Sequence, residues 1–151
     1  MNTLHCLIKQ VLLAATLAAA LIASHAQAQT AADTSAFQAF GAKPGLVSLM
    51  DDFMTRLLAD PRTGPFFQKA NQEHLKEQLV DQFCAALSGP CSYKGLDMKG
   101  AHQDLEIRKG EFNALVEILQ ASMNARGVPF SAQNQLLAKL APMHRDIITV
   151  R

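Results

Sequence analysis

The chain has little excess charge of either sign. Its 14 lysine and arginine residues are nearly matched by 13 aspartate and glutamate residues, for a formal net charge of +1. Nucleic-acid sites and polybasic membrane patches both depend on clustered positive charge. The near-neutral balance argues against nucleic acid as a partner, and it favours small uncharged molecules or other proteins.

The common catalytic motifs are missing as well. The chain contains no Gly-rich phosphate loop, no Gly-x-Ser-x-Gly, no His-Glu-x-x-His and no Cys-x-x-Cys. An ordinary hydrolase or transferase therefore has no motif to support it. Internal repeats and sustained heptads are also absent, and 151 residues leave room for one compact domain.

Long hydrophobic runs are confined to the first 28 residues, which have the features of a secretory signal peptide. Lys9 carries the formal charge, residues 11–23 are an unbroken run of Val, Leu, Ala, Thr and Ile, and Ala26 and Ala28 are small residues at the usual cleavage positions. The run is shorter than the roughly 20 apolar residues that span a bilayer. We expect cleavage after residue 28, export to a bacterial periplasm, and no membrane span after cleavage.

Beyond residue 28 the apolar residues recur every three or four positions, which predicts helices. No convincing strand alternation is present, so the expected fold class is all-α. The expected organisation is a linker or short first helix over residues 29–44, then a domain over 45–151 with principal helices over residues 46–59, 71–87, 112–123 and 131–147.

Glycine, proline and capping residues set the expected ends of these helices. A turn is expected at Lys43-Pro44-Gly45, helix stops at Asp60-Pro61, Ser88-Gly89-Pro90 and Gly127-Val128-Pro129, and N-caps at Asn71 and Ser131. Residues 96–105 form an apolar segment that is too short to be a stable helix by itself.

Cys84 and Cys91 remain after the expected cleavage, whereas Cys6 leaves with the signal. An oxidising compartment allows a disulfide between them. Sequence spacing does not show whether their Cβ atoms converge, so a bridge and two free, buried thiols stay equally open.

Three histidines follow the signal: His74, His102 and His144. His102 differs from the others in its surroundings, because it lies on the short segment and is followed by Ile107 and Phe112. A haem iron needs one strong imidazole donor among apolar side chains that keep water from the ring. His102 is therefore the candidate iron ligand.

Several short runs in this order and spacing resemble the group 1 truncated haemoglobins. They are Leu58-Ala59-Asp60-Pro61-Arg62, Pro65-Phe66-Phe67, Ser88-Gly89-Pro90, Tyr93-x-Gly95, Met98-Lys99-x-Ala101-His102 and Gly127-Val128. The resemblance implies a two-over-two helical sandwich around one non-covalent b-type haem. The missing Cys-x-x-Cys-His agrees, since covalent c-type attachment uses that motif.

The resemblance also assigns site residues. His102 falls on the proximal histidine, Phe67 on a phenylalanine that packs against the porphyrin, and Met98, Ile107 and Phe112 on the proximal wall. On the distal side the sequence departs from the family. Met54 stands where many members have a tyrosine, and Leu75 and Leu79 stand where they have polar residues.

Gln78 and His74 are the polar residues beside these distal positions, and His74 could act as an alternative distal ligand in a six-coordinate haem. Each residue of a helix turns about 100° from its neighbour, so neither shares the direction of both Leu75 and Leu79. We therefore expect a largely apolar distal pocket.

These observations favour an exported gas-binding haem protein, a carrier, scavenger or sensor of oxygen, carbon monoxide or nitric oxide. Two alternatives stay open. One is a haem enzyme, either a nitric oxide dioxygenase or peroxidase-like, and the other is a haem-free helical interaction module. The expected partners are the gas and an unknown reductase or electron donor.

Overall fold

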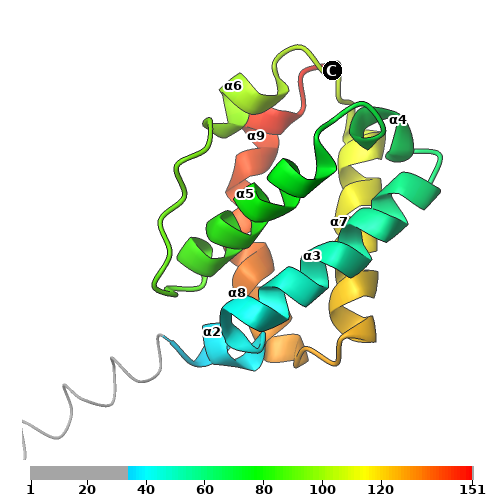
Figure 1. Ribbon diagram of the computed structural model, residues 1–151. Helices are drawn as coiled ribbons and strands as arrows, with labels where there is room; N and C mark the ends of the chain where they lie inside the picture. The colour runs from blue at the N-terminus through cyan, green and yellow to red at the C-terminus, as the bar shows by residue number, and fades with distance from the viewer. Residues whose placement is uncertain (1–33, 151) are drawn as a thin grey trace, which may run out of the picture. The chain divides into compact units, whose positions relative to one another are not determined.

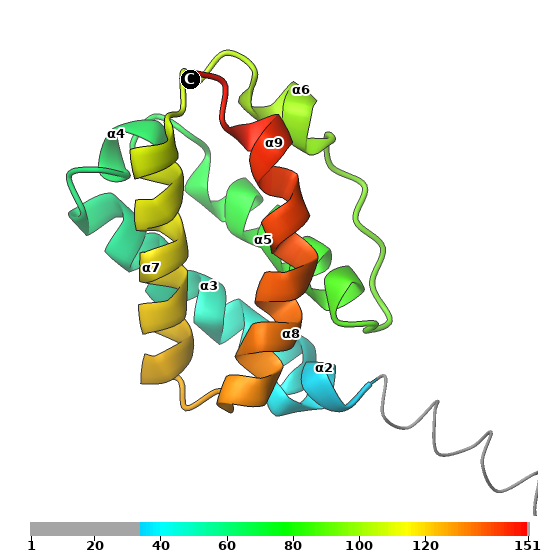
Figure 2. The same cartoon turned by 180° about the vertical axis from the view of Figure 1, so that it is seen from behind.

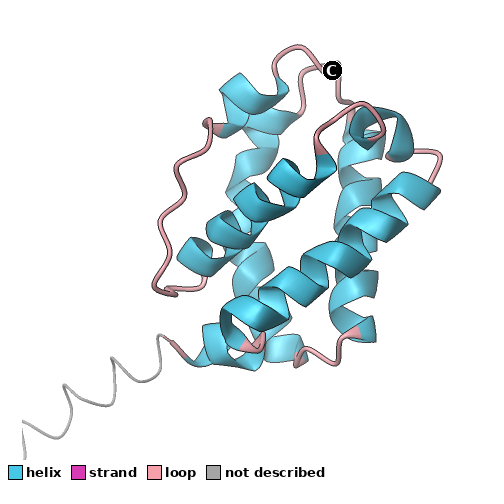
Figure 3. Ribbon diagram, viewed as in Figure 1, coloured by secondary structure: helices cyan, strands magenta, loops and turns pink. Residues whose placement is uncertain are grey.

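The computed structural model describes residues 34–150, and this part of the chain is helical without strands. The expected signal peptide and the first residues of the expected linker, up to residue 33, lie outside the described residues. The helices are α2 (Ser35–Ala39), α3 (Ala42–Ala59), α4 (Gly64–Phe67), α5 (Gln72–Ala86), α6 (Met98–His102), α7 (Lys109–Ala125), α8 (Phe130–Leu140), the 3₁₀ turn η1 (Ala141–Met143) and α9 (His144–Ile147). Figure 3 shows them joined by loops.

The four long helices form two layers. In Figure 1, α3 and α5 lie side by side in the nearer layer, and α7 and α8 lie behind them. Helix α7 packs on α3, α8 packs on α5, and the short α2 packs on α8. The predicted all-α fold with four principal helices is confirmed, and it is a two-over-two sandwich.

The core between the layers follows from the helical spacing of apolar residues. On α3 the side chains of Leu46, Leu49, Met50, Phe53 and Leu57 are buried. They meet Val80 and Phe83 of α5, Ile118 and Leu119 of α7 and Leu136 of α8. The amphipathic pattern in the sequence therefore selects the faces that pack.

The turn expected at Lys43-Pro44-Gly45 is wrong, because these residues form the first turn of α3. Proline fits there since the first N–H groups of a helix have no intrahelical acceptor. Gly45 is required at this point by close approach: a Cβ on it would collide with the carbonyl oxygen of Phe40. The glycine lets α2 and α3 meet at a sharp corner.

Helix ends elsewhere follow the sequence with two exceptions. Asn71 caps α5 as expected, with its side-chain oxygen accepting the His74 N–H at 3.1 Å. Ser131 is not a cap, since α8 begins at Phe130 and Pro129 occupies the N-cap position with a non-helical ψ of 138°. The last helix is also not continuous to Ile147, because Pro142 lies in the 3₁₀ turn that separates α8 from α9.

Among the described residues, no helix combines the length and the apolar character that crossing a membrane requires.

Candidate functional site

His102 is the last residue of α6, a helix of five residues. The helix is too short to be stable alone, and its first turn is held by Asp97, whose Oδ1 accepts the Gly100 N–H at 2.6 Å. The Nδ1 atom of His102 lies 2.7 Å from the carbonyl oxygen of Met98. Because a carbonyl can only accept, Nδ1 carries the proton and donates it.

This hydrogen bond fixes the tautomer of the imidazole. When Nδ1 carries the only ring proton, Nε2 keeps its lone pair. Within residues 34–150 no hydrogen bond is made to Nε2. Metal-bound histidines have this arrangement, with the second ring nitrogen donating to a carbonyl or carboxylate. The side chain is partly exposed, so Nε2 is available to a metal.

The chain after His102 is held by the C-terminal segment. The Ile107 N–H donates to Thr149 Oγ1 at 3.0 Å, and the Ile107 carbonyl accepts from the N–H groups of Thr149 and Val150 at 2.9 and 3.1 Å. In Figure 2, α6 and α9 lie together beside this C-terminal segment. The loop that follows His102, residues 103–108, is therefore closed by residues about forty positions further along the chain.

The apolar residues assigned to the pocket come from five helices and one loop. Met54 of α3 and Ile107 are buried outside the continuous core cluster, whereas Leu79 of α5 and Phe67 of α4 pack against its edge. The other three, Leu75, Met98 and Phe112, are partly buried. The Phe112 ring lies 6.4 Å, centre to centre, from the His144 ring.

The donor set fits haem better than a bare metal ion. No group of three or more His, Cys, Asp or Glu side chains that could hold a metal ion occurs among the residues that the structure describes. A porphyrin supplies four ligands of its own, so the protein needs to add only one imidazole and an apolar lining. His102 and the partly exposed apolar walls provide these two features.

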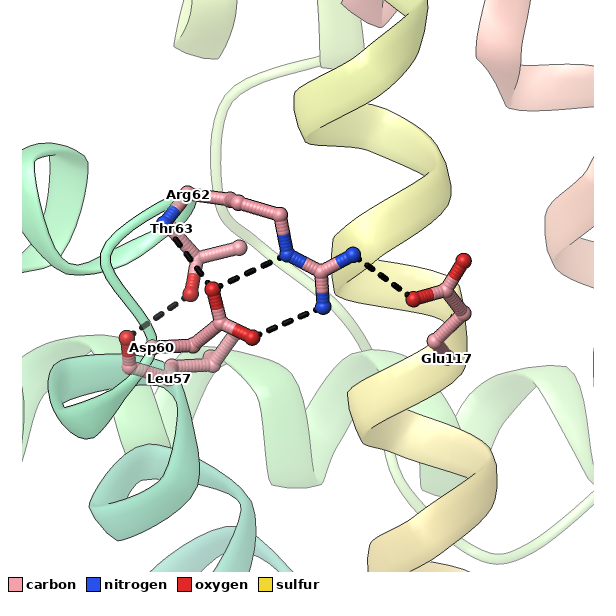
Figure 4. A network of polar contacts seen from close by, with 5 residues as sticks. All are labelled: Leu57, Asp60, Arg62, Thr63 and Glu117. Carbon is pink, nitrogen blue, oxygen red and sulfur yellow. Dashed lines mark hydrogen bonds and ion pairs between the residues drawn. The ribbon is translucent and has the colours of Figure 1, made fainter.

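Phe67 is positioned by a polar network at the end of α3 (Figure 4). The Arg62 guanidinium binds both carboxylate oxygens of Asp60, at 3.0 and 2.8 Å, and reaches Glu117 of α7 at 2.8 Å. The buried Thr63 hydroxyl donates to the Leu57 carbonyl at 2.8 Å. These hydrogen bonds from Arg62 lower the pKa of Asp60 and hold the turn that leads into α4.

The two polar distal candidates are turned elsewhere in this structure. The buried Oε1 atom of Gln78 lies against Gly95, so close that a Cβ on Gly95 would be 2.5 Å from it. His74 is 65% exposed, and its ring lies 4.0 Å from the Glu77 carboxylate. By helical spacing, Gln78 and His74 project about 60° and 100° from the direction of Leu75, on the side away from Leu79.

Gln82 of α5 was missed by the sequence reasoning. Its Nε2 atom lies 3.6 Å from the Met98 sulfur and 3.8 Å from the Met143 sulfur, so it contacts both α6 and η1 beside the apolar walls. The sequence contained a signal for it, because Gln82 follows Leu75 by seven residues, which is two helical turns.

Tyr93 and the cysteines belong to the loop between α5 and α6. The Tyr93 hydroxyl donates to the Leu96 carbonyl at 2.8 Å, and burial together with the Asp97 charge raises its pKa. Cys84 and Cys91, left open above, form a disulfide with a Cα–Cα distance of 5.7 Å. The bridge ties the start of this loop to α5.

Two surface clefts lie away from His102. One is lined by residues that include Lys43, Asp81 and Lys94, and the other by residues that include Arg62, Glu111 and Glu117. Both are open and carry charged side chains, so neither suits an apolar macrocycle.

A globin is the class of protein that this two-over-two helical sandwich defines. The family model for bacterial-like globins matches residues 35–149. The chain is 32% identical over 124 residues to the group 1 truncated hemoglobin GlbN of Mycolicibacterium paratuberculosis, covering 82% of this chain and 91% of that protein. It is also 32% identical to the group 1 truncated hemoglobin of Tetrahymena thermophila, over 61% of this chain and 76% of that protein.

Solved structures agree. A glutamine-to-glutamate variant of the truncated hemoglobin from Tetrahymena pyriformis, in its Fe(III) form, superposes with a TM-score of 0.72 at 25% identity, covering 76% of this chain and 97% of that one. A 2/2 hemoglobin from a Synechococcus species, described with covalently attached heme, matches in fold with a TM-score of 0.71 at 22% identity, over 76% of this chain and 98% of that one.

The chain therefore belongs to the bacterial-like globins and, among them, to the group 1 truncated haemoglobins. Its cofactor is haem, and membership of this family implies that it binds a diatomic gas. The haem-free helical module considered above is set aside.

Proposed function

We propose that the protein reversibly binds oxygen, carbon monoxide or nitric oxide at a haem iron whose protein ligand is His102. The hydrogen bond from His102 Nδ1 to the Met98 carbonyl carries this proposal, because it leaves Nε2 unprotonated, with a lone pair that can bind the iron. Bound haem supplies an iron atom with a position for the gas. The protein holds the imidazole at the end of α6 and keeps water away with apolar side chains such as Phe67 and Leu79.

The distal residues support binding without turnover. Met54, Leu75 and Leu79 offer no hydrogen-bond donor to a polarised ligand and no group that could move a proton. Peroxidase chemistry needs a distal acid or base, and a dioxygenase needs a stable oxygen complex. We therefore propose a gas-binding protein, without catalytic residues, that holds oxygen weakly relative to carbon monoxide and nitric oxide.

Absorption spectra of the ferric, ferrous and carbonyl forms test the role of His102. His102→Ala should lose stable haem or hold it weakly, because no other histidine lies on α6. His144→Ala is the matched control, since His144 also donates through Nδ1 to a backbone carbonyl, that of Ala141 at 2.8 Å, but belongs to α9. A His102→Ala protein with the wild-type five-coordinate ferrous spectrum would show that the ligand lies elsewhere.

Export is a second part of the proposal. The charge, apolar run and small residues of positions 1–28 support it, and so does the disulfide between Cys84 and Cys91, because such bonds persist in oxidising compartments. Mass spectrometry of the periplasmic fraction should find a mature protein that begins near Gln29. Recovery of the full-length chain from the cytoplasm alone would contradict export.

A further inference from the structure

The face of α5 that carries Leu75 and Leu79 includes one polar residue, Gln82. Leu75, Leu79 and Gln82 are spaced by four and three residues, so their side chains project within about 60° of one another around the helix. Gln82 lies about 20° from the direction of Leu75, and Gln78 lies about 60° from it on the same side, further from Leu79. By direction, Gln82 belongs to the pocket face more closely than Gln78 does.

The amide of Gln82 has only weak acceptors within the described part of the chain. Its Nε2 atom lies 3.6 Å from Met98 Sδ and 3.8 Å from Met143 Sδ. A thioether sulfur accepts a hydrogen bond poorly. Removing an amide from water without a good partner is unfavourable, so a partly buried glutamine among methionines gains free energy from any stronger acceptor in the pocket.

The neighbours of Gln82 link it to the site. Met98, which it contacts, is the residue whose carbonyl accepts the hydrogen bond from His102 Nδ1. Met143 belongs to η1, directly before α9, which packs on α6. Gln82 thus projects from α5 to contact both α6 and η1.

We propose that Gln82 supplies the hydrogen-bond donor that this pocket presents to a polar, iron-bound diatomic ligand. The inference rests on the proposed function, because it requires haem held by His102. Sequence analysis named Gln78 and His74 as the polar candidates for this role, and the proposal assigns it to Gln82 instead. The distal side is then apolar at Met54, Leu75 and Leu79 and polar at Gln82.

The C–O stretching frequency of the ferrous carbonyl protein tests the assignment. A donor beside bound carbon monoxide favours transfer of electron density from iron to the ligand, which lowers this frequency. Gln82→Leu, which keeps the approximate size of the side chain, should move the band to higher frequency. It should also speed oxygen dissociation roughly three- to tenfold, the effect expected from losing one neutral hydrogen bond.

Gln78→Leu is the matched control on the same helix, and it should leave the band and the oxygen rate at their wild-type values. Gln82→Asn, with an amide on a shorter side chain, should give a band between those of wild type and Gln82→Leu. A wild-type band in Gln82→Leu, or a shift in Gln78→Leu instead, would overturn the assignment. A wild-type protein that forms no carbonyl complex would overturn the proposed function itself.

Discussion

At the scale of single residues, Met54 is the position where a substitution is expected to change ligand binding most. Its side chain is buried, 4% exposed, and it stands where the resemblance described above places a tyrosine. A hydroxyl donor to a polarised ligand contributes about 1.5–3 kcal/mol, so Met54→Tyr should slow oxygen release roughly ten- to a hundredfold. Stopped-flow measurement of oxygen dissociation checks this. Met54→Phe, which adds the ring without the hydroxyl, should not slow release.

Asp97 is expected to control haem retention without touching the haem. Its carboxylate caps α6, and loss of such a cap costs about 1 kcal/mol. Asp97→Ala should therefore speed transfer of haem to a scavenger protein roughly fivefold. Asp104→Ala is the control, since Asp104 lies exposed in the loop after α6. Equal rates in the two variants would mean that the cap does not support His102.

At the scale of secondary-structure elements, the contact between Ile107 and the C-terminal segment is open to a direct test. Thr149→Val removes the hydroxyl that accepts the Ile107 N–H but keeps the shape of the side chain. Loss of one hydrogen bond of about 1 kcal/mol should raise amide exchange in residues 103–108 roughly fivefold. Thr149→Ser keeps the hydroxyl and should exchange like wild type. Unchanged exchange in Thr149→Val would show that the two backbone hydrogen bonds suffice.

The elements also show what could be predicted from sequence. The long helices were predictable because apolar spacing and terminal proline or glycine act locally, as at Asp60-Pro61 and Gly127. The short helices α4, α6 and α9 were not, since helices of four or five residues exist only where tertiary contacts hold them. The turn predicted at Lys43-Pro44-Gly45 was wrong because the same residues suit both a turn and the first turn of a helix.

The candidate site divides in the same way. His102 could be named as the candidate ligand from the sequence, because the neighbouring motifs carry the family resemblance, and its role stays a prediction. Gln82 was not identified, because its importance comes from two methionine sulfurs on α6 and η1, which lie 16 and 61 residues away in sequence. The direction of Gln78 toward Gly95 likewise depends on the path of a loop that has no helical period.

At the scale of the whole molecule, the disulfide between Cys84 and Cys91 should contribute to stability. It closes a loop with a sequence separation of seven residues, for which chain entropy gives about 2–3 kcal/mol. Cys91→Ser should therefore lower the melting temperature by roughly 10 °C. Ser92→Ala, at the next position, should change it little. Two titratable thiols in the oxidised, denatured mature protein would contradict the bridge.

The contacts of Ile107 also impose an order on the biogenesis of the protein. Its acceptor, Thr149 Oγ1, is made 42 residues later in the chain. At the usual pace of synthesis this is a delay of roughly two to eight seconds. During that interval the nascent chain already contains His102, but the loop that follows it has nothing to close against. Haem bound at this stage would be held only weakly, because the loop after His102 is not yet closed. We therefore expect stable haem binding only in the finished polypeptide.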